Sequence, residues 1–199
     1  MIINKAECRN ETVWECLVTH NGRQIDKWRH YFDIYEKHFA RFVGKSPRVM
    51  EIGVDHGGSL QLWKSYFGPG AEILGVDINP ECAAYVEEQI MVATYDQKDA
   101  RLAQAGMFDI IIDDGSHLLH DQRTAFNHLW SKCRGVYLIE DINDTQIYAT
   151  TSMAPESVGF YYPHVAVVER AQRIIKGKPS RKLRADEIAA RTLYGEVPL

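Results

Sequence analysis

Several features that define large protein classes are missing from this 199-residue sequence. Its longest apolar runs have the length of a strand, well short of the roughly 20 residues that cross a bilayer, so no membrane span is predicted. Segment 1–10 does not pair basic residues with an apolar stretch, and we therefore expect no secretory signal. The four cysteines form no CxxC pair, which argues against zinc spacing and favours a reduced, cytoplasmic protein.

The sequence also lacks an excess of positive charge. It has 23 Lys and Arg against 27 Asp and Glu, a formal net charge of −4, which argues against a nucleic-acid partner held through its phosphates. The basic run 176–184 is interpreted as a solvated surface. The length suits one well-cored domain, so residues 1–199 are expected to form a single domain.

What the sequence does contain is an alternation of strand-like and helix-like segments. Residues 11–42 place aromatic and aliphatic side chains at helical spacing, and Asn21-Gly22 is expected to divide them into two helices. Four strands are expected at 48–54, 72–78, 108–114 and 135–141, with helices at 59–66, from Pro80 onwards and up to Trp130. This alternation predicts a doubly wound, mostly parallel α/β sheet over 48–199 behind a helical cap segment at 1–47. Residues 158–162 and 164–170 predict an antiparallel hairpin at its edge.

A glycine-rich turn follows the first expected strand, in the order Glu51-Ile52-Gly53-Val54-Asp55-His56-Gly57-Gly58-Ser59. Gly53 permits a tight turn, and Gly57 and Gly58 allow a ligand to approach the backbone closely. The GxxxGG spacing matches neither the dinucleotide fingerprint nor the P-loop. An acidic strand before a wide turn favours a cationic amino-acid ligand over a pyrophosphate.

Asp77 ends the second expected strand, 20 residues after Gly57. At that position a carboxylate can accept hydrogen bonds from both hydroxyls of a ribose. The alternative role is a helix cap, but Asn79 is better placed to cap the helix that Pro80 opens. The ribose role is favoured.

Four carboxylates are expected at the ends of neighbouring strands: Asp113, Asp114, Glu140 and Asp141. They would repel one another unless a cation lay between them. Oxygen ligands of this kind suit Mg²⁺ or Ca²⁺ better than zinc. A helix-capping role for Asp113 or Asp114 is the alternative, and it accounts for one acid only.

His117 lies three residues after Asp114, in the turn before a helix. A neutral imidazole with an ordinary pKa of roughly 6.5 can accept a proton at physiological pH. Although a lone histidine is usually structural, its place beside these acids makes His117 the candidate general base. His120, one turn further on beside Asp121, is the competing candidate.

Three stretches resemble a known family: EIGVDHGGSLQLWKSYFGPGAEILGVDINP, FDIIIDDGSHLLHDQRTAFNHL and GVYLIEDIND. They resemble the metal-dependent O-methyltransferases of macrolide sugars, the mycinamicin and tylosin types, together with enzymes historically labelled cephalosporin hydroxylases. The resemblance extends from about Asp26 to Glu169. It implies a Rossmann-like class I methyltransferase sheet that binds S-adenosylmethionine.

The resemblance also implies a role for each candidate residue. The ribose would lie on Asp77, Mg²⁺ or Mn²⁺ on Asp114, Glu140 and Asp141, and His117 would be the base. His30 and Tyr35 are expected to help close the cofactor site. Lys27 and Tyr31 are expected to help close it as well, and Asp96 and Gln97 would lie near the adenine. The other cofactor contacts would come from Glu51, Gly53, Gly57, Gly58, Ser59 and Asp113.

The sequence departs from the family after the IED motif, where larger members carry an insertion over the acceptor. Here about 16 residues separate Asp141 from Val158. We expect an acceptor pocket that is open, built from the N-terminal helices, or completed by another subunit, which leaves a homo-oligomer open.

The expected function is O-methylation of a sugar or diol hydroxyl on a small molecule in secondary metabolism, with neither nucleic acid nor membrane as partner. One alternative is a non-haem iron oxygenase, which the absence of any HxD or HxE pair disfavours. Metal analysis after anaerobic iron loading would discriminate it. The other is a non-catalytic S-adenosylmethionine-binding module, which methyl transfer to any diol would exclude.

Overall fold

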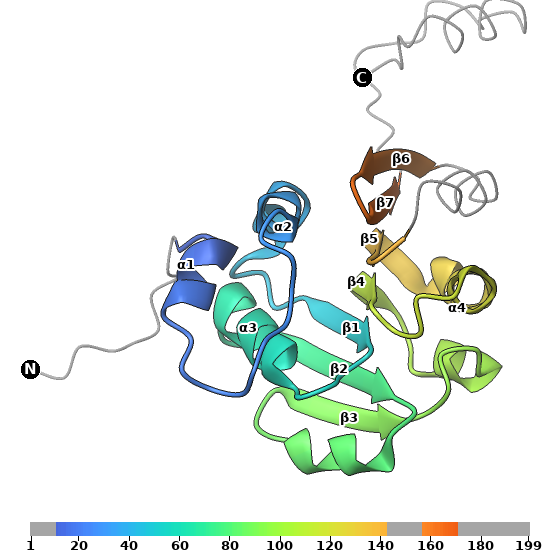
Figure 1. Ribbon diagram of the computed structural model, residues 1–199, viewed down its shortest axis with the longest axis horizontal. Helices are drawn as coiled ribbons and strands as arrows, with labels where there is room; N and C mark the ends of the chain where they lie inside the picture. The colour runs from blue at the N-terminus through green and yellow to red at the C-terminus, as the bar shows by residue number, and fades with distance from the viewer. Residues whose placement is uncertain (1–10, 143–156, 171–199) are drawn as a thin grey trace, which may run out of the picture.

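Seven strands form one sheet in the computed structural model, which describes residues 11–142 and 157–170 (Figure 1). The strands are β1 (Arg48–Ile52), β2 (Glu72–Asp77), β3 (Ile90–Thr94), β4 (Phe108–Asp113), β5 (Cys133–Ile139), β6 (Ser157–Tyr162) and β7 (Val165–Arg170). The helices are α1 (Val13–Val18), α2 (Tyr31–Phe39), α3 (Gly58–Phe67) and α4 (Leu119–Leu129), with 3₁₀ helices η1 (Ala40–Phe42), η2 (Pro80–Tyr85), η3 (Ala100–Gln104) and η4 (Trp130–Lys132). The basic run 176–184 lies outside the described residues.

The sheet has the order β3-β2-β1-β4-β5-β7-β6. Its first five strands are parallel, whereas β7 is antiparallel to both β5 and β6. This confirms the predicted doubly wound sheet with an antiparallel hairpin at its edge. The chain reverses its progress across the sheet between β1 and β4, and ligands of such sheets bind outside the carboxyl ends of the strands at this reversal.

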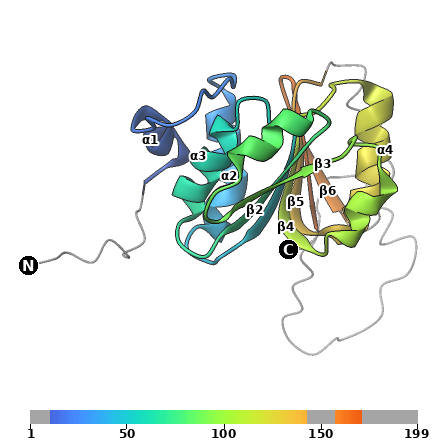
Figure 2. The same ribbon diagram turned by 90° about the horizontal axis from the view of Figure 1, so that it is seen from below.

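Helices cover both faces of the sheet (Figure 2). The helices α1, α2 and α3 lie on one face, over a core that includes Val49 and Ile110, and α4 lies on the other, over Met50 and Ile111. Consecutive strand residues divide between the two cores because side chains alternate across a strand. Both faces are therefore buried, which is why the strands are apolar almost throughout.

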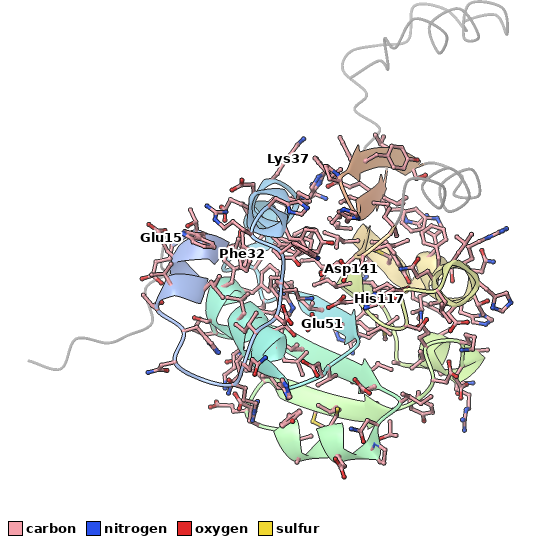
Figure 3. All side chains as sticks on the ribbon, viewed as in Figure 1. Glu15, Phe32, Lys37, Glu51, His117 and Asp141 are labelled. Carbon is pink, nitrogen blue, oxygen red and sulfur yellow. The ribbon has the colours of Figure 1, made fainter. Side chains whose placement is uncertain are left out.

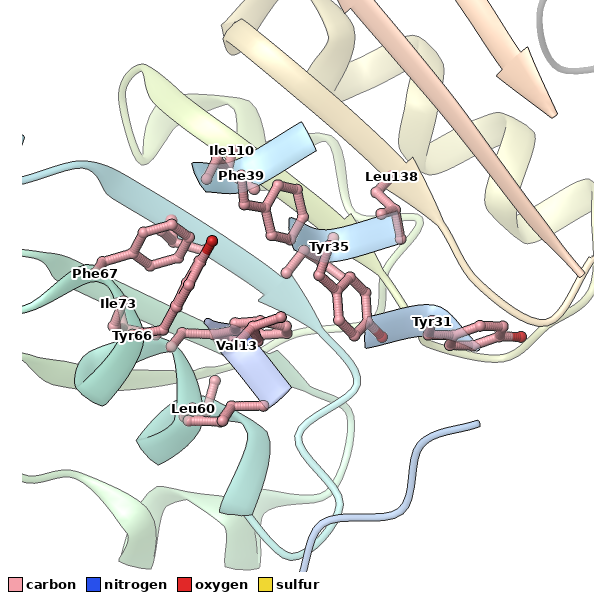
Figure 4. Close-up of a cluster of buried hydrophobic side chains, with 14 of the residues drawn as sticks. Val13, Tyr31, Tyr35, Phe39, Leu60, Tyr66, Phe67, Ile73, Ile110 and Leu138 are labelled. Carbon is pink, nitrogen blue, oxygen red and sulfur yellow. The ribbon is translucent and has the colours of Figure 1, made fainter. Parts of the chain in front are cut away.

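Helix α2 is attached to the first core by aromatic side chains at helical spacing. Tyr31, Tyr35 and Phe39 recur every four residues and are at most 1% exposed (Figure 4). The rings of Tyr35 and Phe39 both pack edge-on against Trp63 of α3, with centroid distances of 5.0 and 5.8 Å. This packing fixes the helix beside the strand ends and brings two tyrosine hydroxyls to them.

Two elements differ from the sequence-based expectation. The helix predicted to open at Pro80 is the 3₁₀ helix η2, and the Asn79 side chain caps it by accepting a hydrogen bond from the N–H of Glu81 at 3.0 Å. Asn79 is thus the cap, as expected, but the segment ends after six residues because Val86 returns to extended backbone. The bounds of β3 were not predicted; it is an edge strand whose apolar run, 90–93, is short, and Met91 in that run is 62% exposed.

Candidate active site

The carboxyl ends of β1, β4 and β5 bring the predicted acids together. Backbone hydrogen bonds align these ends: the N–H of Asp114 donates to the carbonyl of Ile52, and the N–H of Glu140 donates to that of Asp113, both at 2.9 Å. Asp141 follows with a φ of +51°, a left-handed conformation that is uncommon outside glycine. Asp114, Glu140 and Asp141 line one cavity of about 820 Å³.

A lysine from the segment before α2 lies among three acids on the buried side of this cavity. The Nζ of Lys27 lies 2.5 Å from Asp114 Oδ2, 3.0 Å from Glu140 Oε2 and 3.3 Å from Glu51 Oε1. The lysine side chain is 4% exposed. Burial lowers the pKa of Lys27, but attraction to the carboxylates, Glu140 foremost, outweighs burial and holds this pKa well above its usual range. The ammonium therefore stays charged.

Two tyrosines of α2 hold the acids that follow β5. The Tyr35 hydroxyl donates to Glu140 Oε1 at 2.7 Å, and the Tyr31 hydroxyl donates to Asp141 Oδ1 at 2.6 Å. Burial raises the pKa of Glu140, and the Lys27 ammonium opposes that rise. Both oxygens of Glu140 thus already accept hydrogen bonds, one from a hydroxyl and one from an ammonium.

The open side of the cavity carries a second group, made of Asp114, His117 and Asp141. His117 Nδ1 lies 4.0 Å from Asp114 Oδ1, and His117 Nε2 lies 3.9 Å from Asp141 Oδ2. One ligand atom from each residue lies within 4.8 Å of the others, and the two carboxylates offer the oxygen ligands that a hard divalent ion prefers. Figure 3 shows His117 and Asp141 together at the strand ends, near Glu51. Glu140 is not in this group, and its role as a metal ligand stays a prediction.

The nucleotide half of the predicted site lies around Asp77. Its Oδ2 accepts hydrogen bonds from the N–H groups of Val54 and Asp55 at 2.8 and 3.3 Å, and its Oδ1 accepts one from Asn79 at 2.8 Å. Asp77 therefore shapes the glycine-rich turn through its carboxylate. It also lines both the large cavity and a neighbouring cavity of about 260 Å³.

The predicted cofactor residues divide into those that reach a cavity and those that lie behind its wall. Cavity walls are formed by Lys27, Tyr31, Gly53, Asp77, Asp96 and Gln97. No cavity wall described here includes Glu51, Gly57, Gly58, Ser59 or Asp113. Glu51 instead accepts a hydrogen bond from the Ser59 hydroxyl at 2.7 Å. Their cofactor contacts stay predictions.

Close contacts within the chain itself explain why two positions of the turn are glycine. Gly53 has a φ of +90°, and a Cβ there would collide with the carbonyl of Asp114. A Cβ at Gly58 would collide with the carbonyl of Gln24, because the segment before α2 crosses the start of α3. Part of the close approach expected for a ligand is therefore made by the chain's own backbone.

Sequence reasoning missed the aromatic rim of the large cavity. Trp28 lines it with 61% of its surface exposed, and its ring stacks on His164 at a centroid distance of 6.4 Å and an interplanar angle of 19°. His164 has a φ of +61° in the β6–β7 turn. The only sequence signal is that Trp28 directly follows Lys27.

Comparison with known proteins adds to this geometry. No protein-family model matches the chain. It is 36% identical over 156 residues to the 8-demethyl-8-(2-methoxy-alpha-L-rhamnosyl)-tetracenomycin-C 3'-O-methyltransferase of Streptomyces olivaceus, which covers 71% of this chain and 40% of that protein. It is 42% identical over 123 residues to the mycinamicin VI 2''-O-methyltransferase of Micromonospora griseorubida. That alignment covers 54% of this chain and 30% of that protein. This chain is a homologue of sugar O-methyltransferases.

Among solved structures, this chain resembles the MycE methyltransferase of the mycinamycin biosynthetic pathway, whose structure was determined in complex with Mg, SAH and mycinamycin VI. The TM-score is 0.70 at 26% identity, over 93% of this chain and 60% of that one. The sheet is thus that of a class I methyltransferase. The chain spans 40% or less of the length of the curated relatives named here.

Asp113, a buried acid behind the site, has a raised pKa. Asp113 is fully buried, and its Oδ1 accepts hydrogen bonds from the Gly115 N–H and the Gln97 amide, both at 3.4 Å. Burial raises its pKa from 3.8 to about 7; the Gly115 N–H opposes this rise and the Asp114 charge adds to it. The folded chain thus retains this proton at pH values where the unfolded chain has released it.

We predict that Asp113→Asn, which keeps the shape without the titration, gains stability over wild type as pH rises. The unfolded aspartate ionises from about pH 4 and the folded one only near pH 7, so the wild-type free energy of unfolding falls across that window. The relative gain between pH 4 and pH 8 should approach about 4 kcal/mol. Urea unfolding at several pH values measures it, with Asp33→Asn as an exposed control. A difference that stays constant with pH contradicts the buried proton.

Proposed function

We propose that this chain is the catalytic core of an S-adenosylmethionine-dependent and Mg²⁺-dependent O-methyltransferase that acts on a hydroxyl of a sugar or diol. The observation that carries this proposal is the shared cavity, whose wall includes Asp114, His117 and Asp141 together with Gly53 and Asp77. A methyl donor and an activated hydroxyl need this proximity, because the protein's contribution is to orient the two reactants.

The two cavities suit the two ends of the methyl donor. Both are lined by Gly53, Asp77 and Gly115, so a ribose at Asp77 would connect a methionine arm in the large cavity to an adenine in the small one. The small cavity is lined by Ile78, which is 69% exposed, and by Gln97. This division agrees with the roles that the resemblance implies for Asp77 and Gln97.

Asp114 and Asp141 would hold the divalent ion, with Glu140 as the third predicted ligand. When bound, the ion would act as a Lewis acid that lowers the pKa of the acceptor hydroxyl. His117 would then accept the hydroxyl proton, since its side chain lines the same cavity as Asp114 and Asp141. S-adenosylmethionine would supply the methyl group, and its carbon–sulfur bond would break as the acceptor oxygen bonds to the methyl carbon.

An iron oxygenase is not favoured by this geometry. The group on the open side has two carboxylates and one histidine, whereas the non-haem iron triad has two histidines and one carboxylate.

The acceptor would approach over the exposed rim. Trp28 lines the same cavity as His117 and offers a flat apolar ring, which suits a sugar ring whose hydroxyls point to the ion. The proposed acceptor is a sugar or diol in natural-product biosynthesis.

No described helix combines the length and the apolarity that a membrane crossing requires.

We expect Asp77→Asn to weaken the binding of S-adenosylhomocysteine by roughly 30-fold, because a charged acceptor for the ribose hydroxyls is lost. The amide oxygen can still accept from the N–H groups of Val54 and Asp55, so the fold should persist although the hydrogen bond from the Asn79 N–H is lost. Calorimetric titration measures the affinity, and thermal unfolding checks the fold. Asp55→Asn, which changes an exposed acid of the same cavity, is the control. Unchanged affinity in a folded Asp77→Asn variant excludes the ribose role.

We expect His117→Ala to lower turnover by roughly 10² to 10⁴ while S-adenosylhomocysteine binding stays close to wild type. The assay is transfer of a labelled methyl group to a panel of sugars and catechols in the presence of Mg²⁺. His120→Ala is the control, because His120 is 85% exposed and pairs with Asp121 outside the cavity. An inactive His120→Ala beside an active His117→Ala would place the base one helical turn further on.

A further inference from the structure

Lys27 uses its whole hydrogen-bonding capacity on the chain's own acids. An ammonium group has three donors and no acceptor. The three contacts of Nζ, to Asp114, Glu140 and Glu51, account for all three donors. No donor is left for the carboxylate of a bound methionine arm. The cofactor contact expected for Lys27 is therefore not its main role.

The three partners of Lys27 come from three different strands. Glu51 lies within β1, Asp114 follows β4 and Glu140 follows β5. The side chains of Glu51 and Glu140 are at most 1% exposed, and that of Asp114 is 19% exposed. Carboxylates this close and this buried repel one another unless a cation separates them. Lys27 is that cation, supplied from outside the sheet by the segment before α2.

The two carboxylate oxygens of Asp114 face different sides of the cavity. Its Oδ2 contacts the Lys27 ammonium, while its Oδ1 faces His117 and the open group with Asp141. The ammonium thus fixes the rotation of this carboxylate and leaves one oxygen for a ligand. The positive charge of Lys27 also offsets one negative charge of the group, Asp114, His117 and Asp141, that would hold a divalent ion.

We propose that Lys27 is a positioning residue that acts as a built-in cation. It orients Asp114 and Glu140, lets the acidic strand ends fold in the absence of metal, and sets the affinity of the open group for a divalent ion. The inference rests on the proposed function, since it takes the open group to be the metal site. Three acids (Glu51, Asp114 and Glu140) contact the Lys27 ammonium, and Asp141 lines the same cavity, so removing Lys27 takes away the cation that separates these carboxylates.

The test compares Lys27→Met, which removes the charge, with Lys27→Arg, which keeps it. Lys64→Met is the matched control, because Lys64 also pairs with an acid, Glu87 at 3.1 Å, away from the cavity. Mn²⁺ binding is followed by calorimetry and electron paramagnetic resonance, and thermal unfolding is measured with Mn²⁺ and with EDTA.

We expect Lys27→Met to bind Mn²⁺ roughly tenfold or more tightly than wild type, since a nearby positive charge no longer opposes the ion. Its unfolding temperature in EDTA should fall and should recover with Mn²⁺, more than in wild type. Lys27→Arg and Lys64→Met should keep the wild-type Mn²⁺ affinity. If Lys27→Met folds only with Mn²⁺, native near-ultraviolet circular dichroism should return with Mn²⁺ and not with NaCl of equal ionic strength.

The inference is overturned if Lys27→Met binds Mn²⁺ no more tightly than wild type, if Lys27→Arg behaves like Lys27→Met, or if Mn²⁺ does not restore a misfolded Lys27→Met. Failure of the proposed function gives a different result. If wild type binds no divalent ion, the metal requirement fails, whereas a new Mn²⁺-dependent stability in Lys27→Met still supports the built-in cation.

Discussion

The arrangement of this molecule depends on the repulsion among acids at the carboxyl ends of β1, β4 and β5. Parallel strands bring these ends to one edge of the sheet, and the sequence places a carboxylate at or near each of them. Burying such charges is costly unless each one is paired and hydrogen-bonded. Lys27 supplies the charge on the buried side, and the hydroxyls of Tyr31 and Tyr35 supply the hydrogen bonds.

The same contacts explain why the segment before β1 belongs to the site. Tyr35 and Phe39 pack on Trp63, and this packing holds α2 where its two hydroxyls reach Glu140 and Asp141. Backbone strain gathers at the same place, since His117, Asp141 and His164 all have positive φ values. Residues held in such conformations cost energy and persist where the surrounding structure imposes them, which is common at functional sites.

Much of the fold could be predicted because its signals are local. Runs such as 108–114 and the Asn79 cap after β2 depend on neighbours in the sequence, and the acids at the strand ends then follow from topology. Which of those acids contact Lys27 and which face the open side of the cavity could not be predicted. Lys27 is 87 residues from Asp114 and 113 from Glu140, and nothing local indicates that its ammonium contacts both. The role of Gly58 was hidden for a similar reason, because its space is taken by Gln24 from a distant segment.

The most direct test of this account is anomalous diffraction from crystals grown with Mn²⁺ and S-adenosylhomocysteine. We expect a Mn²⁺ peak on the open side, in contact with Asp114 and Asp141, with Lys27 still bound to Glu51 and Glu140 behind it. S-adenosylhomocysteine should lie along Gly53 and Asp77 in the same cavity. A peak at the position of the Lys27 ammonium, with the lysine displaced, would contradict the account, and so would no peak at saturating Mn²⁺.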